Sequence, residues 1–132
     1  MLPQAPILCA DTIVCQLDKV YGKPQDENHA RQILNELQGG RHLVMTAVAV
    51  AVPGEEGNAS LLRLNTSEVT LAQMSSQEID SYIQSKEPFG KAGAYGIQGK
   101  MAAYISHING SYSGIMGLPL YETMQLLRLV GI

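Results

Sequence analysis

The chain has 132 residues, of which 45% are hydrophobic and 16% charged, and its formal net charge is −3. These values are ordinary for a globular protein, and the length predicts a single domain, 1–132, that buries one core. The negative charge argues against a sequence-independent nucleic-acid binder, which needs a basic face. No apolar run approaches the ~20 residues that cross a bilayer, and the first six residues lack the basic stretch of a secretory signal. We therefore expect a cytoplasmic protein with neither a nucleic-acid nor a membrane partner.

An apolar, β-rich run opens the chain from Ile7 to Leu17 and predicts a buried strand, followed by a turn at 21–24. Cys9 and Cys15 lie in this run. On a straight strand they are roughly 20 Å apart, which excludes a disulfide between them. We expect both cysteines to be buried free thiols.

The next segments predict one helix and one hairpin. Asp26 is a candidate N-cap and Gly39 a candidate terminator for a helix whose apolar residues recur at helical spacing, namely Ala30, Ile33, Leu34 and Leu37. The runs 42–52 and 61–71 are apolar, and a polar turn at 53–58 separates them. This pattern favours two strands joined as a hairpin.

The second half predicts two further helices and two strands. Ser75 and Glu78 form a capping box for a helix whose inner residues are Ile79, Tyr82 and Ile83. The segments 101–108 and 112–116 are expected to be strands joined by a tight turn, and Pro119 to begin a last helix. The resulting order β-α-β-β-α-β-β-α predicts an α/β fold in which helices flank a mixed twisted sheet.

The segment 91–99 carries the most information about function. It places Lys91 and Gln98 among glycines at 90, 93, 96 and 99. Glycine allows a close approach of the backbone to a ligand, a lysine provides a charge for phosphate, and an amide can read a base. The spacing is not that of a Walker A loop. A turn-rich connector uses glycine as freely, so spacing alone leaves both interpretations open.

Asp11 and Lys23 are the other candidates for chemistry. A carboxylate within an apolar strand is costly unless it is paired, metal-bound or at the mouth of the strand. Asp11 is therefore a candidate to activate water or to hold a divalent ion, although it can also simply end a strand. Lys23 lies on a corner stiffened by Pro24, which suits phosphate binding, but a lone loop lysine is usually only solvated.

Several motifs together resemble one known family. They are Ala10-Asp11-Thr12-Ile13-Val14, Gly22-Lys23-Pro24, Leu37 to Thr46, Lys91 to Gly99, Gly110-Ser111-Tyr112 and Gly117 to Leu120. In this order they resemble the Maf family of nucleoside triphosphate pyrophosphatases, from about Ile7 to Val130. The resemblance implies a fold related to the inosine triphosphatases. It also implies hydrolysis of nucleoside triphosphates to a monophosphate and pyrophosphate with Mg²⁺ or Mn²⁺.

The resemblance also implies roles for individual residues. Asp11 would accept the proton of the attacking water and contact the metal, while Lys23 and Lys91 would neutralise the triphosphate. Thr12 and Gln98 would lie where the family sets its base preference. The Ile-Gln-Gly form of the loop resembles the branch that acts on dTTP and UTP.

One departure from the family pattern has consequences. Family members open with a strand, a Ser-x-Ser-Pro-Arg-Arg loop and a long helix, some sixty residues before the aspartate motif. By this resemblance we expect an N-terminally shortened domain with an unpaired sheet edge, an exposed apolar face or open groove, and a homodimer or domain-swapped oligomer. Activity is expected to suffer, and the alternatives are a non-catalytic protein that binds a nucleotide or a partner, or a purely structural module.

Overall fold

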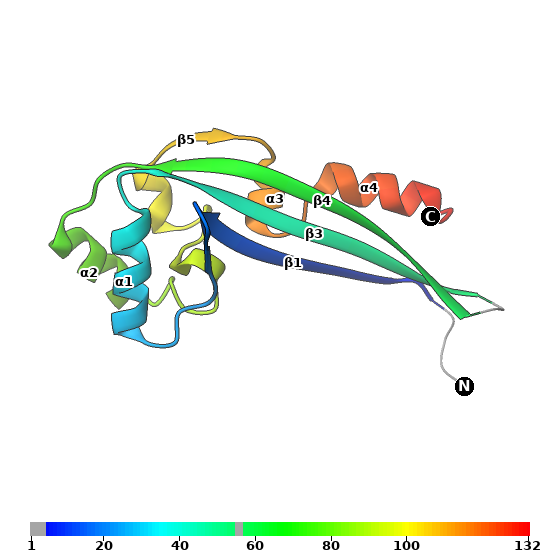
Figure 1. Cartoon of the computed structure of the whole chain (residues 1–132), viewed down its shortest axis with the longest axis horizontal. Coiled ribbons are helices and arrows are strands. Elements are labelled where there is room, and N and C mark those ends of the chain that lie inside the picture. Colours follow the sequence, from blue (N-terminus) through cyan, green and yellow to red (C-terminus); the bar gives the residue numbers. More distant parts are fainter. Residues whose placement is uncertain (1–4, 55–56) are drawn as a thin grey trace.

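A five-stranded antiparallel sheet in the order β2-β1-β3-β4-β5 runs the length of the molecule (Figure 1). The structure is a computed structural model and describes residues 5–54 and 57–132. The strands are β1 (Ile7–Gln16), β2 (Lys19–Tyr21), β3 (Arg41–Gly54), β4 (Gly57–Leu71) and β5 (Ile105–Asn109). The α-helices are α1 (Glu27–Leu37), α2 (Ser76–Gln84), α3 (Tyr112–Met116) and α4 (Leu120–Leu129), and two 3₁₀ turns are η1 (Ala92–Ala94) and η2 (Lys100–Tyr104). The predicted α/β fold with helices flanking a sheet is confirmed. The sheet is antiparallel and not mixed as expected, because every strand pairing within the described ranges is antiparallel.

The predicted hairpin is confirmed as β3 and β4, which pair from Arg41↔Thr70 to Gly54↔Gly57. Its polar turn includes residues 55 and 56, which lie outside the described ranges, as do residues 1–4. Along β3 the even-numbered side chains from 42 to 50 are buried, because successive residues of a strand point to opposite faces. The same alternation fixes the register of β1 on β3.

The main core lies at one end of the sheet, beneath α1 and α2. Both predicted helix starts are confirmed: Asp26 accepts a hydrogen bond from the His29 amide, and Ser75 and Glu78 form a reciprocal capping box. Gly39 follows α1 with a φ of +71°, as expected for a helix terminator. The predicted apolar positions of both helices are all buried: Ala30, Ile33, Leu34, Leu37, Ile79, Tyr82 and Ile83.

The prediction of a strand over 112–116 is wrong, because this segment forms α3. The Ser111 hydroxyl caps the helix by accepting a hydrogen bond from the Gly114 amide, and Gly117 ends it with a φ of +119°. The strand expected over 101–108 is confined to β5, since η2 occupies residues 100–104. Pro119 directly precedes α4, as predicted for a last helix.

Two details of the first strand also differ from expectation. A short strand, β2, was missed; it pairs antiparallel with residues 14–16 of β1 and takes Tyr21 from the predicted turn. Cys9 is exposed and Cys15 is partly buried, so the expectation of two buried thiols is wrong. The cause is that Cys9 pairs with Ala49 and Cys15 with Leu43, so both lie on the face of the sheet that the helices do not cover. Both thiols are free, as expected.

The two faces of the sheet differ. One face packs on the helices, and Val48 and Val50 of β3 meet Leu126 of α4 there. The other, which we call the outer face, carries exposed apolar side chains of β1, β3 and β4, namely Ile7, Ile13, Leu43, Leu62 and Leu64. The expected exposed apolar face is therefore present. Among the described helices, none is long and apolar enough to cross a membrane.

Candidate active site

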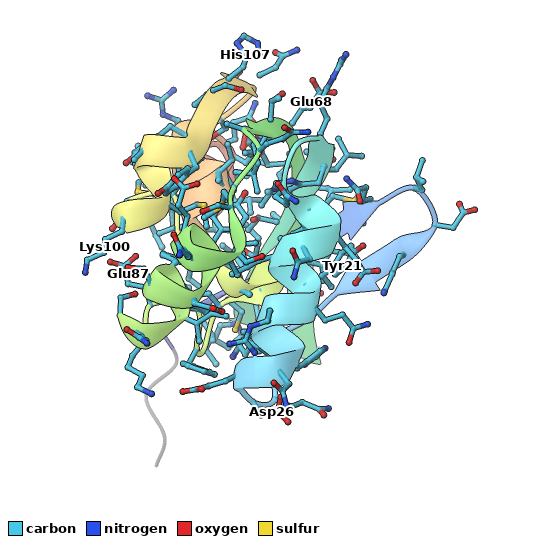
Figure 2. All side chains as sticks on the ribbon, turned by 90° about the vertical axis from the view of Figure 1, so that its left-hand side faces the viewer. Tyr21, Asp26, Glu68, Glu87, Lys100 and His107 are labelled. Atoms are coloured by element: carbon cyan, nitrogen blue, oxygen red, sulfur yellow. The ribbon has the colours of Figure 1, made fainter. Side chains whose placement is uncertain are left out.

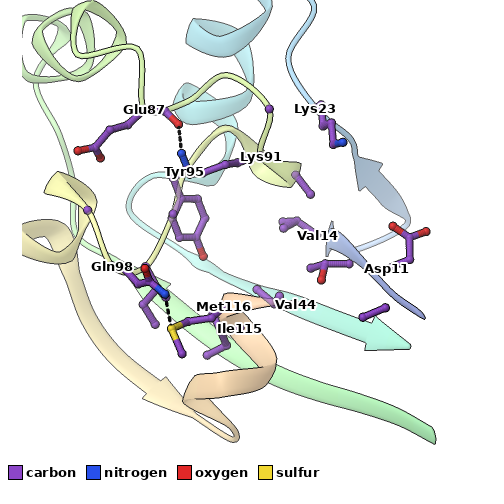
Figure 3. Close-up of a pocket in the computed structure, with 17 residues that line it drawn as sticks. Asp11, Val14, Lys23, Val44, Glu87, Lys91, Tyr95, Gln98, Ile115 and Met116 are labelled. Carbon is purple, nitrogen blue, oxygen red and sulfur yellow. Dashed lines mark hydrogen bonds between the residues drawn. The ribbon is translucent and has the colours of Figure 1, made fainter. Parts of the chain in front are cut away.

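A pocket of about 560 Å³ opens between β1, the turn after β2, the loop 87–99 and α3 (Figure 3). All five residues singled out in the sequence line it: Asp11, Thr12, Lys23, Lys91 and Gln98. They come from segments separated by up to 87 positions in the sequence, counting from residue 11 to residue 98. The structure thus gathers one carboxylate, two ammonium groups, a hydroxyl and a carboxamide around one cavity.

Gly93 joins three walls of this pocket. Its φ is +73°, and a Cβ at this position would lie 2.8 Å from a methyl group of Val14 in β1. Its amide donates a hydrogen bond to the Gly22 carbonyl oxygen at 3.1 Å. The loop that carries Lys91 is therefore held against both β1 and the turn that carries Lys23. Only glycine combines this backbone conformation with so close an approach.

The two lysines are exposed and accessible from the pocket. Lys91 Nζ donates a hydrogen bond to the Glu87 carbonyl oxygen at 2.7 Å, which holds the side chain along its own loop. An ammonium group has three donors, so two N–H groups of Lys91 remain for a ligand. Lys23 forms no salt bridge with any other residue in 5–54 or 57–132. The buried ring of Pro24 anchors its turn.

Asp11 lies at the rim of the pocket, on the same side as Lys23 (Figure 3). It pairs with Ala47 of β3, so strand alternation assigns its side chain to the outer face. Asp11 still lines the pocket, because β2 pairs with β1 only from Val14 onward and leaves the edge of β1 uncovered at Asp11. Asp11 is exposed, and so avoids the cost of a buried charge that its apolar neighbours in sequence suggested.

Gln98 and Thr12 belong to the wall formed with α3. The Gln98 amide nitrogen contacts the Met116 sulfur, and Figure 3 shows both on the side of the pocket away from Asp11. Thr12 is half-buried, and its hydroxyl lies 2.8 Å from that of Thr46. Apolar residues complete this wall: Val44, Ile97 and Ile115. The pocket therefore has a cationic rim and a mixed amide and apolar wall.

Two buried residues, His42 of β3 and Tyr95 of the loop, hold the loop against the sheet. The sequence analysis did not single out either of them as part of the site. His42 Nε2 lies 2.6 Å from Tyr95 Oη, and both residues are buried. Desolvation lowers the pKa of His42 from 6.5 to about 4, so the imidazole is neutral at pH 7. Burial likewise raises the pKa of the Tyr95 hydroxyl, which stays protonated. This neutral pair of side chains joins β3 to the centre of segment 91–99, which we call the glycine loop. The signal available in the sequence was a histidine within an otherwise apolar strand.

Glu87 closes the other end of the loop. Its carboxylate accepts a hydrogen bond from the Lys100 amide at 2.9 Å, and Figure 2 shows the two residues side by side. A Cβ on Gly99 would collide with this carboxylate, so a side chain there would displace the Glu87 side chain from its present position. No feature of the sequence around Glu87 indicates this contact, because it joins residues thirteen positions apart across an irregular loop.

One carboxylate in the pocket is available to a metal ion. Within the described ranges, no group of three or more His, Cys, Asp or Glu side chains is arranged to hold one. Asp11 is exposed at the rim, whereas the Glu87 carboxylate is engaged by the loop. Mg²⁺ commonly binds through one or two carboxylates together with substrate phosphates. Asp11 with the oxygens of a polyphosphate is a donor set that fits this pattern.

Comparisons with known proteins agree with the motifs. The sequence model of the family described as Maf-like protein matches residues 1–130. A protein of Polaromonas sp. named dTTP/UTP pyrophosphatase is 51% identical over 131 residues, which is 99% of this chain and 63% of that protein. Proteins of the same name from Nitrosomonas europaea and Chromobacterium violaceum are 50% and 45% identical, with 61% and 64% of their lengths covered. The chain thus spans less than two thirds of these relatives, and it belongs to the Maf family.

Proposed function

We propose that this chain carries the nucleotide site of a pyrophosphatase that hydrolyses dTTP and UTP to the nucleoside monophosphate and pyrophosphate. The observation that supports it most is the single pocket lined by Asp11, Lys23, Lys91 and Gln98. Relatives at about 50% identity bear the name dTTP/UTP pyrophosphatase. We further propose that the protein works in the cytoplasm, as its sequence predicts.

In the proposed reaction, Asp11 accepts a proton from the attacking water. The water oxygen forms the new bond to the α-phosphorus. The phosphoanhydride bond between the α and β phosphates breaks, and pyrophosphate leaves with the electrons of that bond. Lys23 and Lys91 neutralise the charge that develops on the phosphate oxygens, which is the main task in phosphoryl transfer. Gln98, on the wall away from Asp11, contacts the base.

We also propose that the reaction requires Mg²⁺ or Mn²⁺, held by Asp11 together with phosphate oxygens. Bound there, the ion would add positive charge to the phosphates. Removal of divalent ions with a chelator should abolish turnover, and readdition of Mg²⁺ or Mn²⁺ should restore it. Full turnover in the presence of excess chelator would contradict this part of the proposal.

The experiment that tests the proposal is pyrophosphate release from dTTP and UTP by the wild-type chain and by an Asp11→Asn variant. Loss of a general base typically lowers the rate about 10²–10⁴-fold. The variant should still bind UTP, because both lysines and Gln98 remain. Equal turnover by the two proteins would refute the role of Asp11.

The alternative is a non-catalytic protein that binds a nucleotide or a partner. The observation that favours it is that the chain spans only 63% of the Polaromonas relative, so residues beyond its match can contribute to that enzyme's activity. Binding of UTP by both the wild type and Asp11→Asn, with turnover by neither, would favour this alternative.

Finally, we propose that two copies associate through the outer face. Unpaired strand edges and exposed apolar patches promote self-association. Between Ile7 and Ile13, β1 carries exposed apolar side chains and pairs on one edge with no other strand of the described residues. Leu62→Glu on this face should yield monomers in light scattering. Leu129→Glu on α4 is the matched control, because the two leucines are 61% and 60% exposed. A monomeric wild type would contradict the proposal.

A further inference from the structure

A chain of two hydroxyl groups connects the pocket to α3. Thr12 of β1 lies opposite Thr46 of β3 in the sheet, and their hydroxyl oxygens are 2.8 Å apart. The Thr46 hydroxyl is also 2.8 Å from the carbonyl oxygen of Gly114 in α3. Thr46 is fully buried, whereas Thr12 lines the pocket.

The direction of both hydrogen bonds follows from the number of protons. Two oxygens at 2.8 Å repel each other unless a proton lies between them, and a carbonyl oxygen has no proton to give. Thr46 must therefore donate its only hydroxyl proton to Gly114. The contact between the two threonines then needs the proton of Thr12. Thr12 thus donates to Thr46 and presents only lone pairs to the pocket.

An acceptor at this position selects which part of a nucleotide it can face. The triphosphate of UTP or dTTP has only acceptor oxygens at neutral pH, so Thr12 does not suit it. The donors of the nucleoside are the ribose hydroxyls and the N3–H group of the base. Thr12 and Gln98 also lie on the same wall of the pocket, because both contact the end of α3. A Cβ on Gly117 would lie 3.7 Å from the Thr12 hydroxyl, and the neighbouring Met116 contacts the Gln98 amide.

We propose that Thr46 is a positioning residue that fixes the Thr12 hydroxyl as an acceptor, and that Thr12 thereby recognises the N3–H group of uracil and thymine. Gln98 can donate to a neighbouring base carbonyl. Cytosine carries a lone pair at N3 and would meet the lone pairs of Thr12, so the pocket rejects it. This inference rests on the proposed function, because it assumes that the base occupies this wall.

The test is calorimetric binding of UTP, CTP and 3-methyl-UTP to the wild-type chain in the presence of a chelator, so that affinity is read without turnover. The wild type should bind UTP at least about tenfold more tightly than either analogue, as expected for one hydrogen bond left unmade. Equal affinities for UTP and CTP would overturn the proposal, even if the protein hydrolyses UTP.

Variants of the two threonines test the proton direction. In Thr46→Val the Thr12 proton is released and can turn toward N3 of cytosine, so the UTP-to-CTP affinity ratio should fall about tenfold. Thr46→Ser keeps the hydroxyl and should keep the ratio. If circular dichroism shows that Thr46→Val does not fold, variants of Thr12 replace it. Thr12→Val should bind UTP and CTP with similar affinity, and Thr12→Ser should keep the wild-type UTP-to-CTP affinity ratio.

The outcomes separate this inference from the proposed function. A ratio lost in Thr46→Val but kept in Thr46→Ser supports the inference, whether or not pyrophosphate is released. If Thr46→Val weakens UTP and CTP equally, Thr12 serves a ribose hydroxyl or a water and the inference is wrong, while UTP turnover would leave the proposed function intact.

Discussion

The two ends of the long sheet are built differently. At one end α1, α2 and the glycine loop enclose the main core, in which Ile33, Leu34 and Leu37 are almost completely buried. At the other end β1, β3 and β4 continue as a ribbon with α4 on one face, over a smaller cluster of Val48, Val50 and Leu126 (Figure 1). The pocket lies against the packed end. Its loops are thus held by buried contacts, so the shape of the pocket depends on packing at that end.

The largest effect on stability is expected in the core of the packed end. Ile33→Ala should lower the free energy of unfolding by about 2–5 kcal/mol, because it leaves a cavity among buried side chains. Leu64→Ala on the outer face should change it by no more than about 0.5 kcal/mol, since that side chain is 54% exposed. Urea unfolding measures both, and similar losses would break the contrast between the buried core of the packed end and the exposed outer face.

The next effect is pH-dependent and involves His42. Its pKa is about 4 in the folded chain and near 6.5 when exposed, so the unfolded chain binds more protons between these values. The free energy of unfolding should therefore fall as the pH drops from 6.5 to 4, by up to about 3 kcal/mol, with no penalty above pH 6.5. Unfolding curves of wild type and His42→Gln across this range isolate the contribution. An identical pH dependence in both proteins would exclude it.

A smaller effect is expected at the rim of the pocket. Lys91→Met should raise the dissociation constant for UTP about 10–100-fold, because one charge-assisted contact to phosphate is lost. Lys100→Met is the matched control, since Lys100 is also an exposed lysine near the loop but does not line the pocket. Calorimetry on both variants decides whether UTP affinity depends on the position of the lysine in the pocket or only on the net charge of the chain. Equal weakening would point to net charge.

The smallest effect belongs to the surface of the packed end. Arg31 of α1 and Asp80 of α2 form an ion pair of 2.9 Å, with both side chains well exposed. Replacing either by alanine should cost less than about 1 kcal/mol of unfolding free energy, and 0.5 M salt should remove the difference. A double-mutant cycle gives the pair energy. A value approaching that of Ile33→Ala would show that surface charges, and not the core, hold α1 and α2 together.

The long strands, their hairpin and the helix starts could be predicted because their signals are local. The apolar run of β3 and the side chains of Asp26 and Ser75 act within a few residues of their own position. The prediction of a strand over 112–116 failed because the residues inside this segment favour neither a helix nor a strand. The helix is set at its two ends, where Ser111 caps it and Gly117 ends it.

Sequence motifs single out five residues that line one pocket, but not the residues that support this pocket. The five are Asp11, Thr12, Lys23, Lys91 and Gln98. The contacts of Thr46 with Gly114 and of His42 with Tyr95 join residues 68 and 53 positions apart. Such pairings depend on the register of β3 against the loop and α3, which one sequence does not specify.

Hydrogen exchange followed by mass spectrometry, with and without UTP, tests directly whether the nucleotide binds in this pocket. If the nucleotide occupies the pocket, exchange should slow in segments 10–14, 22–24 and 91–99, while α4 and residues 59–64 of β4 stay unchanged. Unaltered exchange in the glycine loop at saturating UTP, or protection confined to the ribbon end, would contradict the account.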